Sequence, residues 1–194
     1  MQTQDAVSLF TQFFNKALPV FSPQSEAALG ELKPEQLRQA QFRYIFSVEA
    51  MTSISHLIED AAAQSLRPAQ LHVCFQYLSR VRDQRQRYQE ITPRLQGLWL
   101  YAVADAELPG WPNTTFIELA NSPLVNYWFV VAYGTGLSMT LVAEEKVPSQ
   151  GSPVAKRVYE GLYTFDEQLA YKLLNLLHLN FPGQVPPPLP PELP

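Results

Sequence analysis

The sequence predicts a three-layer α/β domain with a mixed sheet, preceded by a helical N-terminal extension. Between residues 42 and 104, segments with strand character alternate with amphipathic helical segments, which is the pattern of a βαβαβ unit. From residue 116 onward, strand follows strand as in a β meander, and one helical segment ends the pattern. The 194 residues, of which 46% are hydrophobic and 16% charged, suffice for one domain with a buried core.

The first 41 residues are predicted to form the helical extension. Phe10 and Phe14 recur at helical spacing with Phe13 beside them, and Pro19 and Pro23 end the helix. A second short helix is expected over residues 34–41, which begin with a proline. Two interpretations of the phenylalanine face stay open: it packs on the protein's own core, or it makes a self-association contact through Phe10, Phe13 and Phe14.

The predicted βαβαβ unit begins with a strand over residues 42–48. Ser47 is a candidate N-cap for the next helix, and Glu49 lies in its first turn. The buried stripe expected for this helix comprises Met51, Ile54, Leu57, Ile58 and Ala61. After a strand over residues 71–75, a helix is expected from Leu78 to Leu95, which Pro93 kinks or ends and Gly97 closes. Residues 98–104 are apolar throughout, as in a strand buried on both faces.

The second half is predicted to add strands over residues 116–120, 127–133, 137–143 and 159–164. Gly134-Thr135-Gly136 is a hairpin signal between two of them. A last helix is expected over residues 165–179, with Thr164 and Glu167 at capping-box spacing. Seven of the 17 prolines lie in residues 182–194, which predicts an extended tail or a linker to a further domain. The predicted division is therefore 1–41, 42–181 and 182–194.

Several classes of function are disfavoured by what the sequence lacks. A net charge of −4 argues against nucleic-acid binding through overall charge, and no apolar run approaches the length of a membrane span. The single cysteine, Cys74, leaves no internal disulfide or cysteine-based metal site, and a buried, inert thiol is expected there. The three histidines have no metal-ligand spacing, and no phosphate loop or nucleophile elbow is present. We therefore predict a cytoplasmic protein without catalytic residues, metal or cofactor.

Three groups of residues are candidates for function. His56, Glu59 and Asp60 share one helix face, where the carboxylates would raise the pKa of the imidazole; a solvated face with a weak ion pair is the alternative. Residues 80–94 carry five arginines and two carboxylates, a net charge of +3, which suits an acidic partner or a phosphate ligand unless the face is merely solvated. The third group is a set of aromatic side chains on strands, which form either core or the wall of a flat pocket: Trp99, Tyr101, Trp128, Tyr133, Tyr159 and Tyr163.

Taken together and in their order along the chain, several segments resemble the DICT domain, a sensory domain of diguanylate cyclases and two-component proteins that is common in cyanobacteria. The resemblance covers residues 42–179. It is carried by the run Ser55-His56-Leu57-Ile58-Glu59-Asp60, Phe75-Gln76, Arg87-Tyr88, Trp128-Phe129-Val130-Val131, Glu144, and the run from Arg157 to Asp166. Tyr163 departs from the pattern, since a tryptophan is expected before Thr164-Phe165-Asp166.

The resemblance implies a non-enzymatic input module that works beside kinase, response-regulator, GGDEF or GAF domains and is associated with light or related signals. We therefore predict a sensory module that acts through protein–protein contacts with a histidine kinase, a response regulator or a GGDEF protein, and that forms a homodimer. The alternative is a regulatory domain that binds a small molecule in an aromatic-lined pocket. The candidate ligand- or partner-binding residues are His56, Glu59, Asp60, Gln76, Arg87, Tyr88, Trp128, Glu144, Arg157 and Tyr163.

Overall fold

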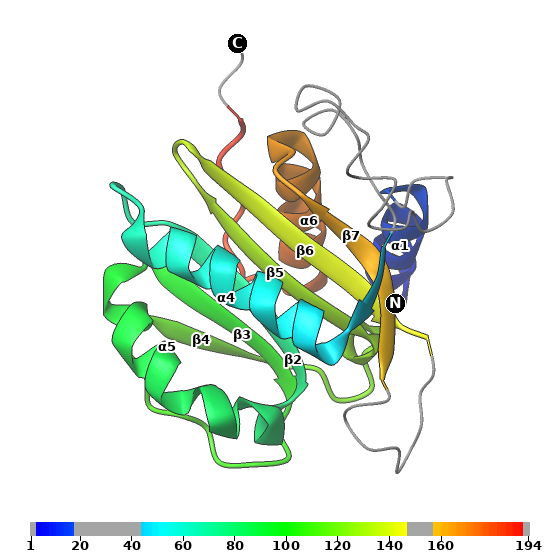
Figure 1. The fold of residues 1–194 in the computed structure, drawn as a ribbon. Coiled ribbons are helices and arrows are strands. Elements are labelled where there is room, and N and C mark those ends of the chain that lie inside the picture. Colours follow the sequence, from blue (N-terminus) through cyan, green and yellow to red (C-terminus); the bar gives the residue numbers. More distant parts are fainter. Residues whose placement is uncertain (1–2, 18–43, 147–156, 192–194) are drawn as a thin grey trace, which may run out of the picture.

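The computed structural model describes residues 3–17, 44–146 and 157–191. In these residues, seven strands form one sheet in the order β1-β7-β6-β5-β2-β3-β4 (Figure 1). The strands are β1 (Tyr44–Ser47), β2 (Gln70–Tyr77), β3 (Gly97–Val103), β4 (Thr114–Glu118), β5 (Tyr127–Gly134), β6 (Leu137–Glu145) and β7 (Val158–Thr164). The helices are α1 (Thr3–Ala17), α4 (Val48–Gln64), α5 (Arg85–Ile91) and α6 (Glu167–Asn180), with the 3-10 segments η1 (Leu78–Gln84), η2 (Thr92–Arg94) and η3 (Pro123–Asn126).

The sheet is mixed, as predicted, but two strands lie elsewhere than expected. β2, β3 and β4 run parallel, so β4 is a parallel edge strand and not part of the meander. β1 does not lie beside β2 but pairs antiparallel with β7 at the opposite edge. The 17-residue helix α4 is about 25 Å long. It therefore carries the chain across the strands between β1 and β2, which are spaced about 4.8 Å apart.

The predicted three layers are present. α4 and α5 cover one face of the sheet, and α6 and α1 lie behind the other face (Figure 1). Alternate residues of β5 feed two separate cores: Phe129 and Val131 face α6, whereas Val130 and Ala132 face α4. β3 is buried on both faces, as its apolar sequence predicts.

Helix α4 begins as predicted, but its buried stripe is shifted. The backbone N–H of Ala50 donates to the N-cap hydroxyl of Ser47 at 3.2 Å. The expected stripe was wrong for Leu57, whose side chain is 54% exposed, and Ile54 and Ala61 are only half-buried. The buried positions are Met51, Ser55, Ile58, Glu59 and Ala62. This stripe also has helical spacing, but it places a hydroxyl and a carboxylate toward the sheet, which hydrophobicity alone does not predict.

The expected single helix from Leu78 to Leu95 is three shorter elements. Only α5 is α-helical, with η1 before it and η2 after it. Pro93 lies in the first turn of η2, where its missing N–H costs nothing, and Gly97 begins β3 and does not close a helix. Arg85, one of the five arginines of residues 80–94, is exposed. The start of the last helix also differs from the prediction, because the N-cap of α6 is Asp166 and not Thr164.

The two ends of the described chain pack on the face that α6 covers. The Phe10 and Phe14 side chains are fully buried, each 5.0 Å from the Tyr127 ring, and Phe13 is half-buried. In this structure Phe10 and Phe14 thus pack in the protein's own core and are not exposed for contact with a second chain. The expected helix over residues 34–41 lies outside the described residues.

Part of the predicted tail, residues 182–191, packs along the same face. Val185 is buried in the core, and its carbonyl accepts a hydrogen bond from His178 Nδ1 at 2.6 Å. Trp99 Nε1 donates to the Gln184 carbonyl at 3.0 Å, and the Tyr133 hydroxyl donates to the Leu189 carbonyl at 2.8 Å. Among the helices that are described, none has the length and apolar character needed to cross a bilayer.

Candidate functional site

A cavity of about 260 Å³ lies on the α4 face, between α4, η1 and the ends of β2, β5 and β7. Its apolar wall includes Val73, Phe75 and the rings of Trp128 and Tyr159, which meet edge to face at 5.4 Å. Polar side chains line the remainder: Ser55, His56 and Glu59 from α4, Arg80, Asp83 and Gln84 from η1, and Arg157. An apolar wall with few converging polar groups is typical of a small-molecule site.

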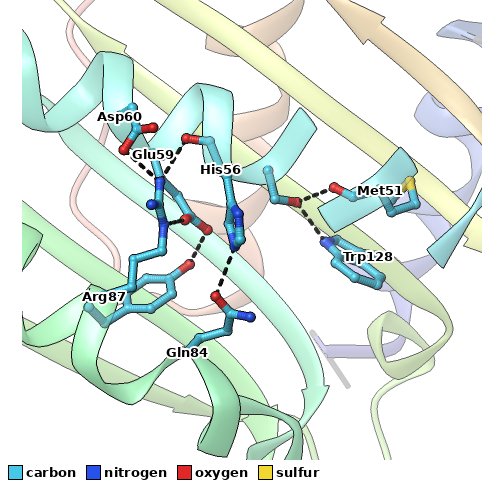
Figure 2. Close-up of polar contacts among 9 residues, drawn as sticks. Met51, His56, Glu59, Asp60, Gln84, Arg87 and Trp128 are labelled. Carbon is cyan, nitrogen blue, oxygen red and sulfur yellow. Dashed lines mark hydrogen bonds and ion pairs between the residues drawn. The ribbon is translucent and has the colours of Figure 1, made fainter. Parts of the chain in front are cut away.

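A buried carboxylate lies at one end of this cavity. The Glu59 side chain is 2% exposed. It accepts a hydrogen bond from the Tyr88 hydroxyl on Oε1 at 2.5 Å and one from Arg87 Nε on Oε2 at 2.6 Å (Figure 2). Burial raises the pKa of Glu59, and the hydrogen bonds from Tyr88 and Arg87 oppose that rise. Burial, together with the Glu59 charge, holds the pKa of Tyr88 well above its usual value.

Arg87 connects α5 to α4. Its Nη2 donates to Asp60 Oδ1 at 2.6 Å and to the His56 carbonyl at 2.8 Å (Figure 2). Burial alone would lower the pKa of Arg87, but Glu59 and Asp60 outweigh burial and raise it. The Asp60 side chain is half exposed, unlike that of Glu59. One guanidinium thus joins a buried and a solvated carboxylate of the same helix.

His56 lies on the same helix as these carboxylates, but its own side-chain partner is Gln84. Its Nε2 lies 2.8 Å from Gln84 Oε1 on η1, which makes a second polar link between α4 and the arginine-rich segment. One residue earlier, the Ser55 hydroxyl donates to the Met51 carbonyl at 2.7 Å and accepts from Trp128 Nε1 at 3.2 Å. Figure 2 shows the contact between His56 and Gln84 and, one residue away on α4, the hydrogen bonds that reach Met51 and Trp128.

A second polar group surrounds Gln76 where β2 ends. Gln76 is buried and has a φ of 65°, at an irregularity in the β2–β3 register. Its Nε2 donates to Glu145 Oε2 at 3.2 Å, and its Oε1 accepts from Arg80 Nη1 and from the Tyr159 hydroxyl. Few residues other than glycine adopt such a φ, and strained backbone of this kind concentrates at functional sites.

The structure brings together eight of the ten candidate ligand- or partner-binding residues. His56, Glu59, Trp128 and Arg157 line the cavity, Gln76, Arg87 and Tyr88 contact its lining residues, and Asp60 is joined to Glu59 through Arg87. Gln84 and Glu145 carry no local signal in the sequence for this region, Ser55 was named only within the polar run on α4, and Arg80 only as one of the five arginines. Tyr159 was named with Trp128 among the aromatic side chains that form either core or the wall of a flat pocket.

Glu144 and Tyr163 lie apart from the cavity. Glu144 faces the α6 side of the sheet and pairs with Lys146 at 2.8 Å, whereas the neighbouring Glu145 faces α4 and meets Gln76. Strand side chains alternate between faces, so a shift of one residue selects the wrong carboxylate. Tyr163 shares a face with Tyr159 but lies near the other end of β7, with its ring 5.1 Å from Phe165.

Three other residues considered for function, Cys74, Trp99 and Tyr101, are buried in the core of the protein. Cys74 is fully buried, and burial raises the pKa of its thiol to about 12. Trp99 and Tyr101 belong to the core under α6. Within the described segments, no three histidine, cysteine, aspartate or glutamate side chains gather as metal ligands would.

A comparison with known protein families finds a match over most of the chain. The model of DICT, the "Sensory domain in DIguanylate Cyclases and Two-component system", matches residues 26–146, more than half of the chain. The chain therefore belongs to the DICT family, as its sequence motifs predict. The matched range includes the Glu59–Arg87 region and ends before Arg157 and Tyr159. A comparison with curated proteins gave no match.

Proposed function

We propose that this DICT domain is a non-catalytic input module of a bacterial signalling pathway, and that it acts by changing its contact with a signalling protein. The family is one of sensory domains in signalling proteins. The partner class that we propose is a histidine kinase, a response regulator or a GGDEF protein, in a pathway linked to light or to two-component signalling. A homodimer in a cyanobacterial protein is part of the same proposal, with contacts other than the buried Phe10 and Phe14.

The Arg87 bridge between α4 and α5 is the observation that supports this proposal. The bridge joins the buried Glu59 to the half-exposed Asp60, so one side chain is in contact with both the cavity wall and the surface. A change in the cavity that moves Glu59 shifts or breaks its 2.6 Å contact with Arg87, which also holds Asp60 at 2.6 Å. The exposed face of α5 beside Asp60 is then the surface on which a partner would detect that change.

The alternative, a regulatory domain that binds a small molecule, is favoured by the cavity itself. The Trp128 and Tyr159 rings form part of a wall of 13 residues around about 260 Å³, and polar groups converge on it from three elements. The two proposals are compatible, since a ligand can be the input and a protein contact the output. A domain of this kind needs no catalytic residue, since binding energy alone shifts its conformational equilibrium.

A pairwise interaction screen tests the protein-contact proposal. Histidine kinases, response regulators and GGDEF proteins from the source genome are tested for binding to the wild-type chain and to Asp60→Asn. Glu167→Gln, which removes an exposed carboxylate from α6 on the opposite face of the sheet, is the matched control. We expect one signalling protein to bind wild type and Glu167→Gln equally and Asp60→Asn more weakly, with the melting temperatures within a few degrees of each other. The proposal is contradicted if Asp60→Asn binds every partner as wild type does, or if wild type binds none of the proteins tested.

A further inference from the structure

Two arginine side chains share the end of the cavity that lies opposite Glu59. Arg80 comes from η1 and Arg157 from the residue before β7, so segments 77 positions apart in the chain place two guanidinium groups on one cavity. Both side chains are partly buried; that of Arg157 is 18% exposed. Like charges in such a setting repel each other more strongly than they would in water.

The neighbouring residues hold these groups in place without neutralising both. Arg80 Nη1 donates to the Gln76 amide oxygen, and its guanidinium lies 4.9 Å from the centre of the Tyr77 ring. Both partners are neutral. Glu145 is the carboxylate beside Arg157, at 3.6 Å from Nε, and it also accepts from Gln76. One carboxylate therefore serves two arginines at this end of the cavity.

Among the described side chains at this end, hydrogen-bond donors outnumber acceptors. Each guanidinium carries five N–H donors, and Gln76, Glu145 and Tyr159 cannot engage all ten. Within the described chain, the Arg157 Nε is buried without a hydrogen-bond partner. Burial and the nearby Arg157 lower the pKa of Arg80, which is the direction expected where a positive charge lacks a counterion.

The other carboxylates of the cavity do not supply that counterion. Glu59, at the opposite end, is bound by Arg87 and Tyr88. Asp83 lines the cavity from η1, but this residue is exposed, so solvent screens the charge of its carboxylate. The positive charge at the Arg80–Arg157 end is thus left for a group that enters the cavity.

We propose that the cavity binds a small molecule with an anionic group, a carboxylate or a phosphate, held by Arg80 and Arg157, and with a flat apolar body against Trp128 and Tyr159. The volume of about 260 Å³ is just below the range of about 300–1,000 Å³ for pockets of drug-sized ligands, which favours a small metabolite. The inference rests on the proposed function for its biological meaning, because it names the class of signal that the module detects.

Binding is tested on the full chain with three probes: 4-hydroxybenzoate, its neutral analogue 4-hydroxybenzamide, and inorganic phosphate. Calorimetry and melting temperature are measured at matched ionic strength, with chloride as the reference anion. We expect the carboxylate to bind at least about tenfold more tightly than the amide, because a hydrogen bond to a charged group contributes about 1.5–3 kcal/mol. Phosphate should raise the melting temperature above that in chloride and should compete with the carboxylate.

Variants then locate the anion site. Arg80→Gln and Arg157→Gln should each weaken carboxylate binding about tenfold or more and abolish the phosphate effect. Arg85→Gln is the matched control, since it removes the same charge from an exposed position five residues after Arg80. It should bind the carboxylate and respond to phosphate as wild type does.

The proposal is overturned if the carboxylate and the amide bind equally, or if phosphate has no effect beyond that of chloride. It is also overturned if Arg85→Gln loses as much binding as the two cavity variants, because the effect is then one of general surface charge. Should Arg80→Gln or Arg157→Gln fail to fold, the acid–amide comparison on wild type decides. Anion binding without any partner in the interaction screen rejects the protein-contact proposal alone, and the reverse result rejects the anion site alone.

Discussion

Substitution of Gly161 tests the packing of the sheet next to the cavity. Gly161 lies in β7 between β1 and β6, opposite Tyr44 on one side and Ala143 on the other. A Cβ added at this position would lie 2.5 Å from both the Cα and the Cβ of Ala143, and closer still to the Val142 carbonyl oxygen. These atoms are backbone or directly attached to it, so no flexible side-chain end can move aside.

The cost follows from this contact. Relief of the clash requires β7 to move away from β6, which stretches the ladder on which Tyr159 is placed. Overpacking in a well-packed core costs about 1–3 kcal/mol and sometimes more. We expect Gly161→Ala to reach the upper part of that range, about 3 kcal/mol, and Gly161→Val to exceed it, because its two further methyl groups have nowhere to go.

Urea unfolding measures this loss. With a slope of about 1–3 kcal/mol per M, a loss of about 3 kcal/mol lowers the midpoint by about 1 M or more. Gly110→Ala is the control, since nothing lies within 4 Å of an added Cβ there. A midpoint for Gly161→Ala equal to that of Gly110→Ala refutes the close-approach reasoning. An unchanged midpoint accompanied by a changed slope would instead indicate a change in the unfolded state.

Three further predictions concern the cores and the Arg87 bridge. Because burial lowers the pKa of His72 to about 3, the unfolded chain takes up a proton below about pH 6.5 while folded His72 stays neutral. As the pH falls from about 6.5 to about 3, this residue should therefore lower the free energy of unfolding by about 1.4 kcal/mol per pH unit. His72→Asn should make the free energy of unfolding, measured with urea, depend less steeply on pH; parallel pH curves for the two proteins contradict this. Arg87→Gln should cost about 3–5 kcal/mol because it leaves Glu59 buried without its ion pair, and adding Glu59→Gln should recover part of that loss in a double-mutant cycle; a purely additive cycle argues against the coupling. Phe10→Asp should lower the melting temperature strongly while the sizing-column mass stays that of wild type, with the exposed Leu9→Asp as control; a change in mass alone would return Phe10 to a self-association role.

The sequence was sufficient to predict the layers and most element types, but not the pairing of strands. The apolar run of β3, the hairpin at Gly134-Thr135-Gly136 and the Ser47 cap are local signals, and each corresponds to an observed element. Which strand β1 joins depends on residues more than 100 positions away, since its partner is β7. No periodicity within β1 contains that information.

For the same reason, only part of the candidate site could be predicted from the sequence. His56, Glu59 and Asp60 are close in sequence, and their helix spacing indicated a shared region, although the residue that the two carboxylates share as a partner is Arg87 and not His56. Arg80 and Arg157 are distant in sequence and meet only in the folded sheet. Glu145 differs from Glu144 by one position, and the face it occupies depends on a register set by β5 and β7.

The strand order explains why α4 and α5 come to lie side by side although β1 and β2 do not. Along the sheet, the path from β1 to β2 and then to β3 moves in one direction, and the three strands point the same way. Right-handed crossovers in one direction place both connecting helices on the same face. α4 arrives at β2 from the far edge, and η1 leaves from the other end of β2, so the space between them opens near Gln76, one residue before β2 ends. The cavity, the bridge from Arg87 and the strained backbone of Gln76 therefore share one origin in the topology.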